Sequence, residues 1–253
     1  MSPGRRAGTF LRVYDVIIAS KPGELMIHDA LSSILQQTLT PARVIVVVDA
    51  DGYVPGAWWD SVAARSPSVE LLLHPGRGMA GAVSAGIRYA SSAYVAFLDA
   101  DDLWMPDKQF RQVGALDADH ALHAVTCSAR NTVLSVGDKG RQSSAVPCAT
   151  FTATTFRAET FQRFGFPDPA AGHHTWLYRW WSQARTQGIR ARHIPYLGLE
   201  RRIHGRNSWC LENEIGHKAL LAELRRIVRT GGDRMVSPKE VCGRTTATPS
   251  TRA

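Results

Sequence analysis

The sequence lacks the features that mark several common protein classes. Its four cysteines, among 253 residues, are widely spaced and form no Cys-x-x-Cys pair, so neither a zinc site nor a disulfide framework is indicated. No stretch approaches the roughly 18 uninterrupted apolar residues of a membrane span. Residues 1–8 lack the apolar segment of a secretory signal. We therefore expect a globular, cytoplasmic chain with reduced thiols and no transmembrane segment.

Two glycine-rich nucleotide-binding motifs are also missing. No Gly-x-x-x-x-Gly-Lys-Ser/Thr occurs, which argues against a P-loop NTPase. The first strand-to-helix turn, residues 20–23, carries no Gly-x-Gly-x-x-Gly, and the glycines at 76–81 lack the first-strand context of that motif. The sequence therefore does not predict a dinucleotide fold.

The charge of the chain is unbalanced. The formal net charge is +8 and the pI is near 9.7, which favours anionic partners such as nucleotides, phospholipid head groups or nucleic acid. Many arginines lie in the second half of the chain. Most of the acidic residues that are candidates for a functional site lie in the first half. A solvated basic surface is the plain alternative.

Short β-branched runs alternate with apolar residues at helical spacing in the first half. We expect strands at 13–19, 43–48, 69–73 and 95–98, and helices at 25–35 and 79–90. This alternation predicts an α/β, Rossmann-like, mostly parallel sheet flanked by helices.

The pattern changes after residue 107 and predicts a mixed subregion of the sheet. We expect a helix to about 116, strands at 121–126 and 131–136, extended segments at 150–155 and within 189–203, and helices at 158–164, 176–187 and 211–228. The predicted organisation is a flexible N-terminus (1–10), one domain with a first half (11–118) and a second half (119–229), and a disordered tail (230–253).

The segment 95–108 carries the clearest chemistry. A short apolar strand is followed at once by Asp99, Asp101 and Asp102, at the carboxyl edge where open α/β sheets bind ligands. Three carboxylates cannot all ionise in an interior without a cation. Closely spaced oxygen ligands suit Mg²⁺ or Mn²⁺ shared with substrate phosphates. The alternative is an acidic loop that begins the next helix.

Three segments together resemble the family 2 glycosyltransferases, which have the GT-A fold and an Asp-x-Asp motif. They are residues 16–52, with apolar strands ending at 49–52, the glycine-rich helix at 77–90, and the acidic segment at 93–108. The resemblance implies transfer of a sugar from a nucleotide diphosphate sugar, UDP- or GDP-linked, with Mn²⁺ or Mg²⁺. It also implies that residues 11–118 are the nucleotide-sugar binding half and residues 119–229 the acceptor-binding half of the same domain.

The resemblance also implies roles for the acids. Asp101 becomes the principal metal ligand, with Asp99 near the ribose and the metal. Asp51, or Asp49 in another register of the loop, holds the base or ribose. Asp102 orients the turn or reaches the donor sugar.

Four further residues fall on matching donor-side segments. Ala19 lies in the first turn and Arg77 at the start of the glycine-rich helix, both assigned to donor binding. Residues 201–208 look like an Arg-x-His segment that closes over the diphosphate, so Arg202 is a predicted phosphate clamp and His204 a metal or phosphate ligand. A plain surface role is the alternative for His204.

The catalytic base is the main departure from the family. Inverting members usually carry a Glu-Asp pair before the aromatic helix, where this chain has His173 and His174. His174, or His173, is the predicted general base, and Asp168 is the nearest alternative acid. The histidines could instead bind metal or acceptor. Trp176 is a predicted stacking surface for the acceptor, with a core position as the alternative.

We therefore predict a metal-dependent, inverting glycosyltransferase acting on an acceptor hydroxyl, with retention left open because the usual base is missing. The acceptor is a glycan, protein, lipid or modified nucleic acid; an anionic acceptor would suit the basic second half. The alternatives are a non-catalytic nucleotide-sugar binding module and a nucleotidyltransferase of related fold. The sugar and the oligomeric state are not defined by the sequence.

Overall fold

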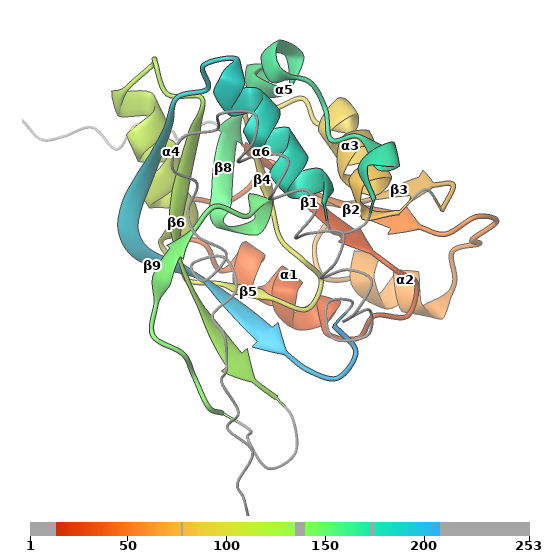
Figure 1. Cartoon of the computed structure of the whole chain (residues 1–253). Helices are drawn as coiled ribbons and strands as arrows, with labels where there is room; N and C mark the ends of the chain where they lie inside the picture. Colours follow the sequence, from red (N-terminus) through yellow and green to blue (C-terminus); the bar gives the residue numbers. More distant parts are fainter. Residues whose placement is uncertain (1–13, 77, 135–139, 173–174, 208–253) are drawn as a thin grey trace, which may run out of the picture.

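The computed structural model describes residues 14–76, 78–134, 140–172 and 175–207 (Figure 1). Its strands are β1 (Tyr14–Ser20), β2 (Arg43–Asp49), β3 (Val69–His74), β4 (Tyr94–Phe97), β5 (Leu103–Trp104), β6 (Ala124–Val133), β7 (Val146–Cys148), β8 (Thr154–Arg157) and β9 (Ala191–Ile203). Its helices are α1 (Ile27–Leu35), α2 (Ala57–Ala63), α3 (Met79–Tyr89), α4 (Lys108–Ala118), α5 (Glu159–Phe164) and α6 (Trp176–Thr186), with 3₁₀ turns η1 (Phe151–Ala153) and η2 (Pro169–Ala171).

The first half forms the parallel part of one sheet. β1 lies between β2 and β4, β3 lies outside β2, and all three pairings are parallel. The continuous apolar runs explain this, because strands buried on both faces need no polar alternation. The carboxyl ends of β1, β2 and β4 therefore meet at one edge. The predicted Rossmann-like arrangement is confirmed.

The second half extends the sheet with mixed pairing. β8 joins β4 antiparallel, β6 joins β8 antiparallel, and the long strand β9 lies parallel to β6. β5 then pairs antiparallel with the far part of β9, and β7 with β6. The full order is β3-β2-β1-β4-β8-β6-β9-β5. The α/β fold with a mixed subregion is confirmed.

Several elements differ from the prediction. The strands expected at 121–126 and 131–136 are one strand, β6, whose pairing with β9 continues through register shifts between Thr126 and Ala129. α2, β5 and β7 were not predicted, because segments of seven, two and three residues carry little periodicity. The residues expected as an N-terminal arm (1–10), a helix (211–228) and a tail (230–253) lie outside the described part of the chain.

Two apolar layers enclose the sheet, one on each face. Alternate residues of β1 divide between them: Val16 and Ile18 belong to the layer covered by α1, α2 and α4, and Ile17 and Ala19 to the layer covered by α3, α5 and α6. The longest helices described have 11 residues, and none of the helices in this part of the chain is long and apolar enough to cross a membrane.

Helix α3 packs closely on the sheet, and Gly86 permits the contact. A Cβ built on Gly86 would lie 2.6 Å from Ile17 Cγ2 and 3.1 Å from Val47 Cγ2, both branches close to the sheet backbone. The small residues of this helix therefore set how near the helix lies to β1 and β2.

We predict opposite effects of alanine at two helical glycines. Gly86→Ala should lower the free energy of unfolding by about 1–3 kcal/mol, because the added methyl overpacks the helix–sheet contact. Gly114→Ala, in α4 with nothing within 4 Å of its Cβ position, should raise it by about 0.5–1 kcal/mol. Urea unfolding of both variants checks this, and a Gly86→Ala protein as stable as the parent would contradict the packing.

Candidate active site

Three carboxylates converge where β4 leaves the sheet. Ligand atoms of Asp99, Asp101 and Asp102 all lie within 4.8 Å of one another. The backbone N–H of Leu98 still donates to Ile17 O of β1 at 3.1 Å, and the N–H of Asp102 donates to Asp99 O at 3.1 Å, closing a turn. The turn thus presents the acids together at the carboxyl edge.

The electrostatics of this cluster favour a bound cation. Burial, and then the neighbouring charge of Asp101, raise the pKa of Asp99 to about 6. Burial and the charge of Asp99 hold the pKa of Asp102 well above its usual value, while Arg201 opposes both shifts. Three clustered carboxylates are a donor set that fits Mg²⁺ or Mn²⁺, since a divalent ion relieves the repulsion between them.

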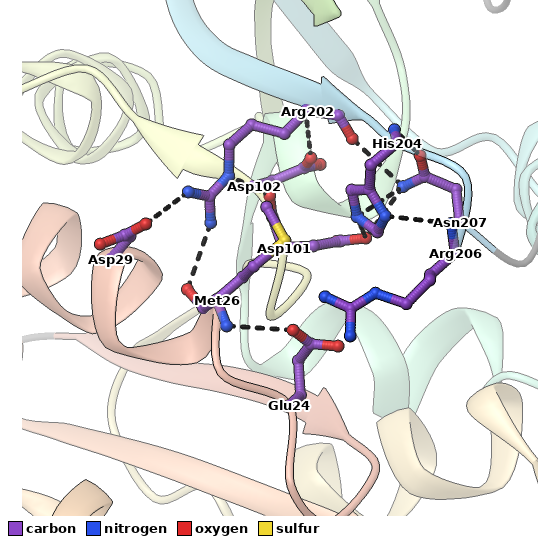
Figure 2. A network of polar contacts seen from close by, with 9 residues as sticks. All are labelled: Glu24, Met26, Asp29, Asp101, Asp102, Arg202, His204, Arg206 and Asn207. Carbon is purple, nitrogen blue, oxygen red and sulfur yellow. Dashed lines mark hydrogen bonds and ion pairs between the residues drawn. The ribbon is translucent and has the colours of Figure 1, made fainter. Parts of the chain in front are cut away.

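Strand β9 brings a distant segment against the acids, because β5 pairs with Leu199 and Glu200. The backbone N–H of Arg202 donates to Asp102 Oδ1 at 2.9 Å. The Arg202 guanidinium, 7% exposed, reaches Asp29 Oδ2 at 2.6 Å, Met26 O at 3.2 Å and the carbonyl of Asp101 (Figure 2). Arg202 therefore ties the acidic turn to the start of α1. Its predicted phosphate contact stays a prediction.

Two side chains from the turn after β9 meet Asp101. His204 Nε2 lies 3.1 Å from Asp101 Oδ2, and Asn207 Nδ2 donates to the same oxygen at 2.9 Å (Figure 2). The predicted proximity of His204 to the acids is thus present; ligation of a metal by His204 stays a prediction. Asn207 was not predicted, because an asparagine in a loop carries no signal until the fold places it beside an acid.

The two alternative acids after β2 differ in their surroundings. Asp49 Oδ1 lies 2.6 Å from His74 Nδ1, and Asp49 Oδ2 accepts the N–H of Gly78 at 2.9 Å. Asp51 lies exposed in the following turn. Asp49 therefore joins the ends of β2 and β3, whereas the Asp51 carboxylate faces solvent. Ala19 is 9% exposed near the end of β1.

The predicted acceptor side is only partly described. Asp168 is exposed and its Oδ1 accepts the N–H of Ala170 at 2.9 Å, which caps η2. Trp176 is 8% exposed and packs edge-on against Phe151, with 5.1 Å between ring centroids. Its surroundings are those of a core residue, and its role in acceptor binding stays a prediction. His173 and His174, and Arg77 on the donor side, lie outside the described residues.

The mixed sheet and the acidic turn at its carboxyl edge define an α/β protein of the GT-A class. The family model described as glycosyl transferase family 2 matches residues 15–180. Because this match spans more than half of the chain, the protein belongs to glycosyltransferase family 2.

Curated relatives match a shorter stretch. The chain is 28% identical over 102 residues to the Escherichia coli UDP-Glc:alpha-D-GlcNAc-diphosphoundecaprenol beta-1,3-glucosyltransferase WfgD, covering 40% of each chain. It is 31% identical over 105 residues to the succinoglycan biosynthesis protein ExoW of Rhizobium meliloti (strain 1021), covering 39% of this chain and 32% of that protein. The matches thus span well under half of these relatives.

Solved structures share the fold. The mannosyltransferase PcManGT from Pyrobaculum calidifontis, in complex with GDP-Man and Mn²⁺, superposes with a TM-score of 0.64 at 20% identity, over 92% of this chain and 68% of that one. S. aureus TarS in complex with UDP gives 0.60 at 15% identity, over 87% of this chain and 74% of that one. At sequence identities this low, the structural similarity establishes that this chain shares the fold of these proteins.

We predict that the acidic turn destabilises the metal-free protein at neutral pH. The folded-state pKa of Asp99 lies above its ordinary value of 3.8, so ionisation opposes folding, and stability falls as the pH rises from about 4 to about 6. Asp99→Asn should therefore be about 1–2 kcal/mol more stable than the parent at pH 7.5 with chelator present, and the gain should vanish near pH 4.

Chemical unfolding at both pH values measures this difference. Asp51→Asn, at an exposed acid of the same sheet edge, should leave stability unchanged at either pH. An Asp99→Asn gain that is equal at pH 4 and pH 7.5 would contradict the raised pKa.

Proposed function

We propose that this protein is a metal-dependent, inverting glycosyltransferase that moves a sugar from a UDP- or GDP-sugar to an acceptor hydroxyl. One observation carries the proposal: in a chain of family 2, three carboxylates converge within 4.8 Å at the carboxyl edge of the parallel sheet. Open α/β sheets bind their ligands at this edge.

The donor side follows from the acids and their neighbours. Asp101 and Asp99 hold Mn²⁺ or Mg²⁺, which when bound supplies positive charge that offsets the leaving diphosphate. Asp51 contacts the base or ribose, and the exposed position of its carboxylate supports this choice over Asp49, whose two oxygens already meet His74 and Gly78. Structures of the shared fold carry GDP-Man with Mn²⁺, or UDP, which supports a nucleotide-sugar donor here.

The acceptor side completes the reaction. The acceptor hydroxyl attacks the anomeric carbon from the face opposite the diphosphate, while a base removes its proton. His174 is the first choice for this base, followed by His173 and Asp168, and Trp176, two residues after His174 in the sequence, is the first residue of α6. The acceptor class is a glycan, protein, lipid or modified nucleic acid.

A donor panel tests the proposal. The protein should release nucleoside diphosphate from at least one UDP- or GDP-sugar in the presence of Mn²⁺ and an acceptor mixture. Asp101→Ala should lower the rate by about 100-fold or more, because the leaving group loses its charge stabilisation. Asp107→Ala should retain the rate, since the Asp107 carboxylate lies beyond the acidic turn, 3.7 Å from the guanidinium of Arg111 at the surface.

The alternatives give different results in this assay. Tight donor binding without release from any sugar would indicate a binding module. Pyrophosphate release from a nucleoside triphosphate and a sugar phosphate would indicate a nucleotidyltransferase. Loss of release in Asp101→Ala but not in His174→Ala would keep the metal site and move the base to another residue.

A further inference from the structure

Two cysteines face each other across neighbouring strands. Cys127 of β6 and Cys148 of β7 are directly opposed in an antiparallel pairing, and the side chains of opposed residues lie on the same face of a sheet. Both are buried in the apolar layer covered by α1, α2 and α4, and both are free thiols. The plain interpretation of this pair is two small apolar core residues.

The side chain of Lys108 argues against a purely apolar role. Lys108 is the first residue of α4 and is fully buried. Its ammonium donates to Gln112 Oε1 at 2.8 Å and lies 4.2 Å from the centroid of the Trp104 ring. Burial lowers the pKa of Lys108 to about 8, and the charges of Cys127 and Cys148, when ionised, oppose this shift. Because a buried ammonium is costly beside apolar groups alone, its place beside two ionisable thiols indicates chemistry at the thiols.

The Cys127 sulfur is held between strand β9 and helix α4. A Cβ built on Gly198 would lie 2.5 Å from Cys127 Sγ and 3.1 Å from Lys108 Cγ, so the sulfur fits because residue 198 has no side chain. Burial raises the pKa of the Cys127 thiol to about 11, while Lys108 and the backbone N–H of Gly198 oppose this rise. The resting thiol is therefore protonated at neutral pH, with an ammonium in place to stabilise the thiolate that reacts.

The strand pairing brings the two cysteines within the span of a disulfide. Opposed residues of an antiparallel pair have Cα atoms about 4.5–5.5 Å apart, inside the range of about 4.4–6.8 Å that disulfides bridge. Strand β7 has three residues and, in the described part of the chain, pairs with β6 alone. Residues 140–145, which precede it, are exposed. A short edge segment of this kind opens at low cost, which gives a small oxidant access to Cys148.

We propose that Cys127 and Cys148 are a redox-active pair that closes to a disulfide between β6 and β7. The oxidant is a small two-electron acceptor, for which the diazene diamide is the probe. The Cys148 thiolate adds to one nitrogen of the N=N bond, and the other nitrogen takes a proton. The Cys127 thiolate then attacks the Cys148 sulfur, so that the S–S bond forms, the S–N bond breaks and the released nitrogen takes the second proton. The two thiols are oxidised, and the diazene is reduced to a hydrazine.

The disulfide would constrain a segment that packs behind the acidic turn. It closes residues 127–148 into a loop and fixes β7, with η1 after it, against β6. Phe151 of η1 packs against Phe97, which precedes the acidic turn, with 5.0 Å between ring centroids. Thr152 O accepts the indole N–H of Trp104, which follows the turn, at 3.2 Å. The inference does not depend on the proposed function, so the absence of sugar transfer would leave it standing.

Peptide mapping of the native protein tests the pair. The full chain carries Cys210→Ser and Cys242→Ser, since these two cysteines lie outside the described residues. It is treated with diamide at neutral pH, the remaining thiols are alkylated, and the digest is analysed by mass spectrometry without reductant. We expect one crosslink, between Cys127 and Cys148, in most molecules, and its reversal by dithiothreitol. Cys148→Ser in the same background is the matched control and should give no crosslink within one chain.

Two results would overturn the pair. One is a digest in which both cysteines are still alkylated after diamide. The other is a crosslink that forms only in denaturant, because such a bond does not belong to the native fold. The oxidised protein should also melt about 3–8 °C above the reduced protein, since the crosslink restricts the unfolded chain. An oxidised protein that melts no higher than the reduced one would show that the native fold does not accommodate the bond.

Lys108→Met tests the ammonium beside the thiols. The substitution keeps the volume of the side chain, and Gln112 Oε1 still accepts the hydroxyl of Thr155 at 2.8 Å, so no buried acceptor loses its last donor. We expect diamide to close the disulfide about tenfold more slowly, the effect of about one unit in the pKa of a thiol. A rate equal to that of the parent would overturn the part assigned to Lys108. Thermal melting of the reduced variants confirms that the fold is intact before rates are compared.

Discussion

The close approach of Asp99, Asp101 and Asp102 is the constraint on which the rest of this site depends. Carboxylates this close at a largely buried sheet edge repel one another and lose hydration, which is why the pKa values of Asp99 and Asp102 are raised. Such a cluster persists only if the surrounding fold holds it and supplies compensating donors. The protein meets this need with backbone and side-chain donors and with the nearby charge of Arg201, and a divalent cation would complete it.

Those donors come from about a hundred residues further along the chain. The short strand β5 pairs with β9 directly after the acids, and this pairing sets Arg202 against Asp102 and Asp101. Arg202 then reaches Asp29 and Met26 at the start of α1, so one buried guanidinium connects the acidic turn, β9 and the first helix. The mixed half of the sheet thus positions the acidic turn as well as extending the sheet.

The sequence predicted the parallel half well, because continuous β-branched runs such as residues 43–48 identify buried strands and the acids directly follow one of them. It predicted the mixed half less well: β6 was expected as two strands, and β5 is too short to show a pattern. Local sequence also did not reveal the partners of Arg202 or the role of Asn207, since these contacts are defined only when β9 lies beside β5. Trp176 shows the limit of composition, because an aromatic helix face is compatible with a core position and with a stacking surface.

We propose that the acidic turn forms a cation-dependent binding site for a nucleoside diphosphate. Calorimetric titration of UDP and GDP into the protein, with Mn²⁺ and then with chelator, measures this dependence. We expect one of the two nucleotides to bind with Mn²⁺, and we expect chelator and the Asp101→Ala substitution each to weaken this binding by about tenfold or more. Equal nucleotide affinity with and without Mn²⁺, unchanged in Asp101→Ala, would contradict it.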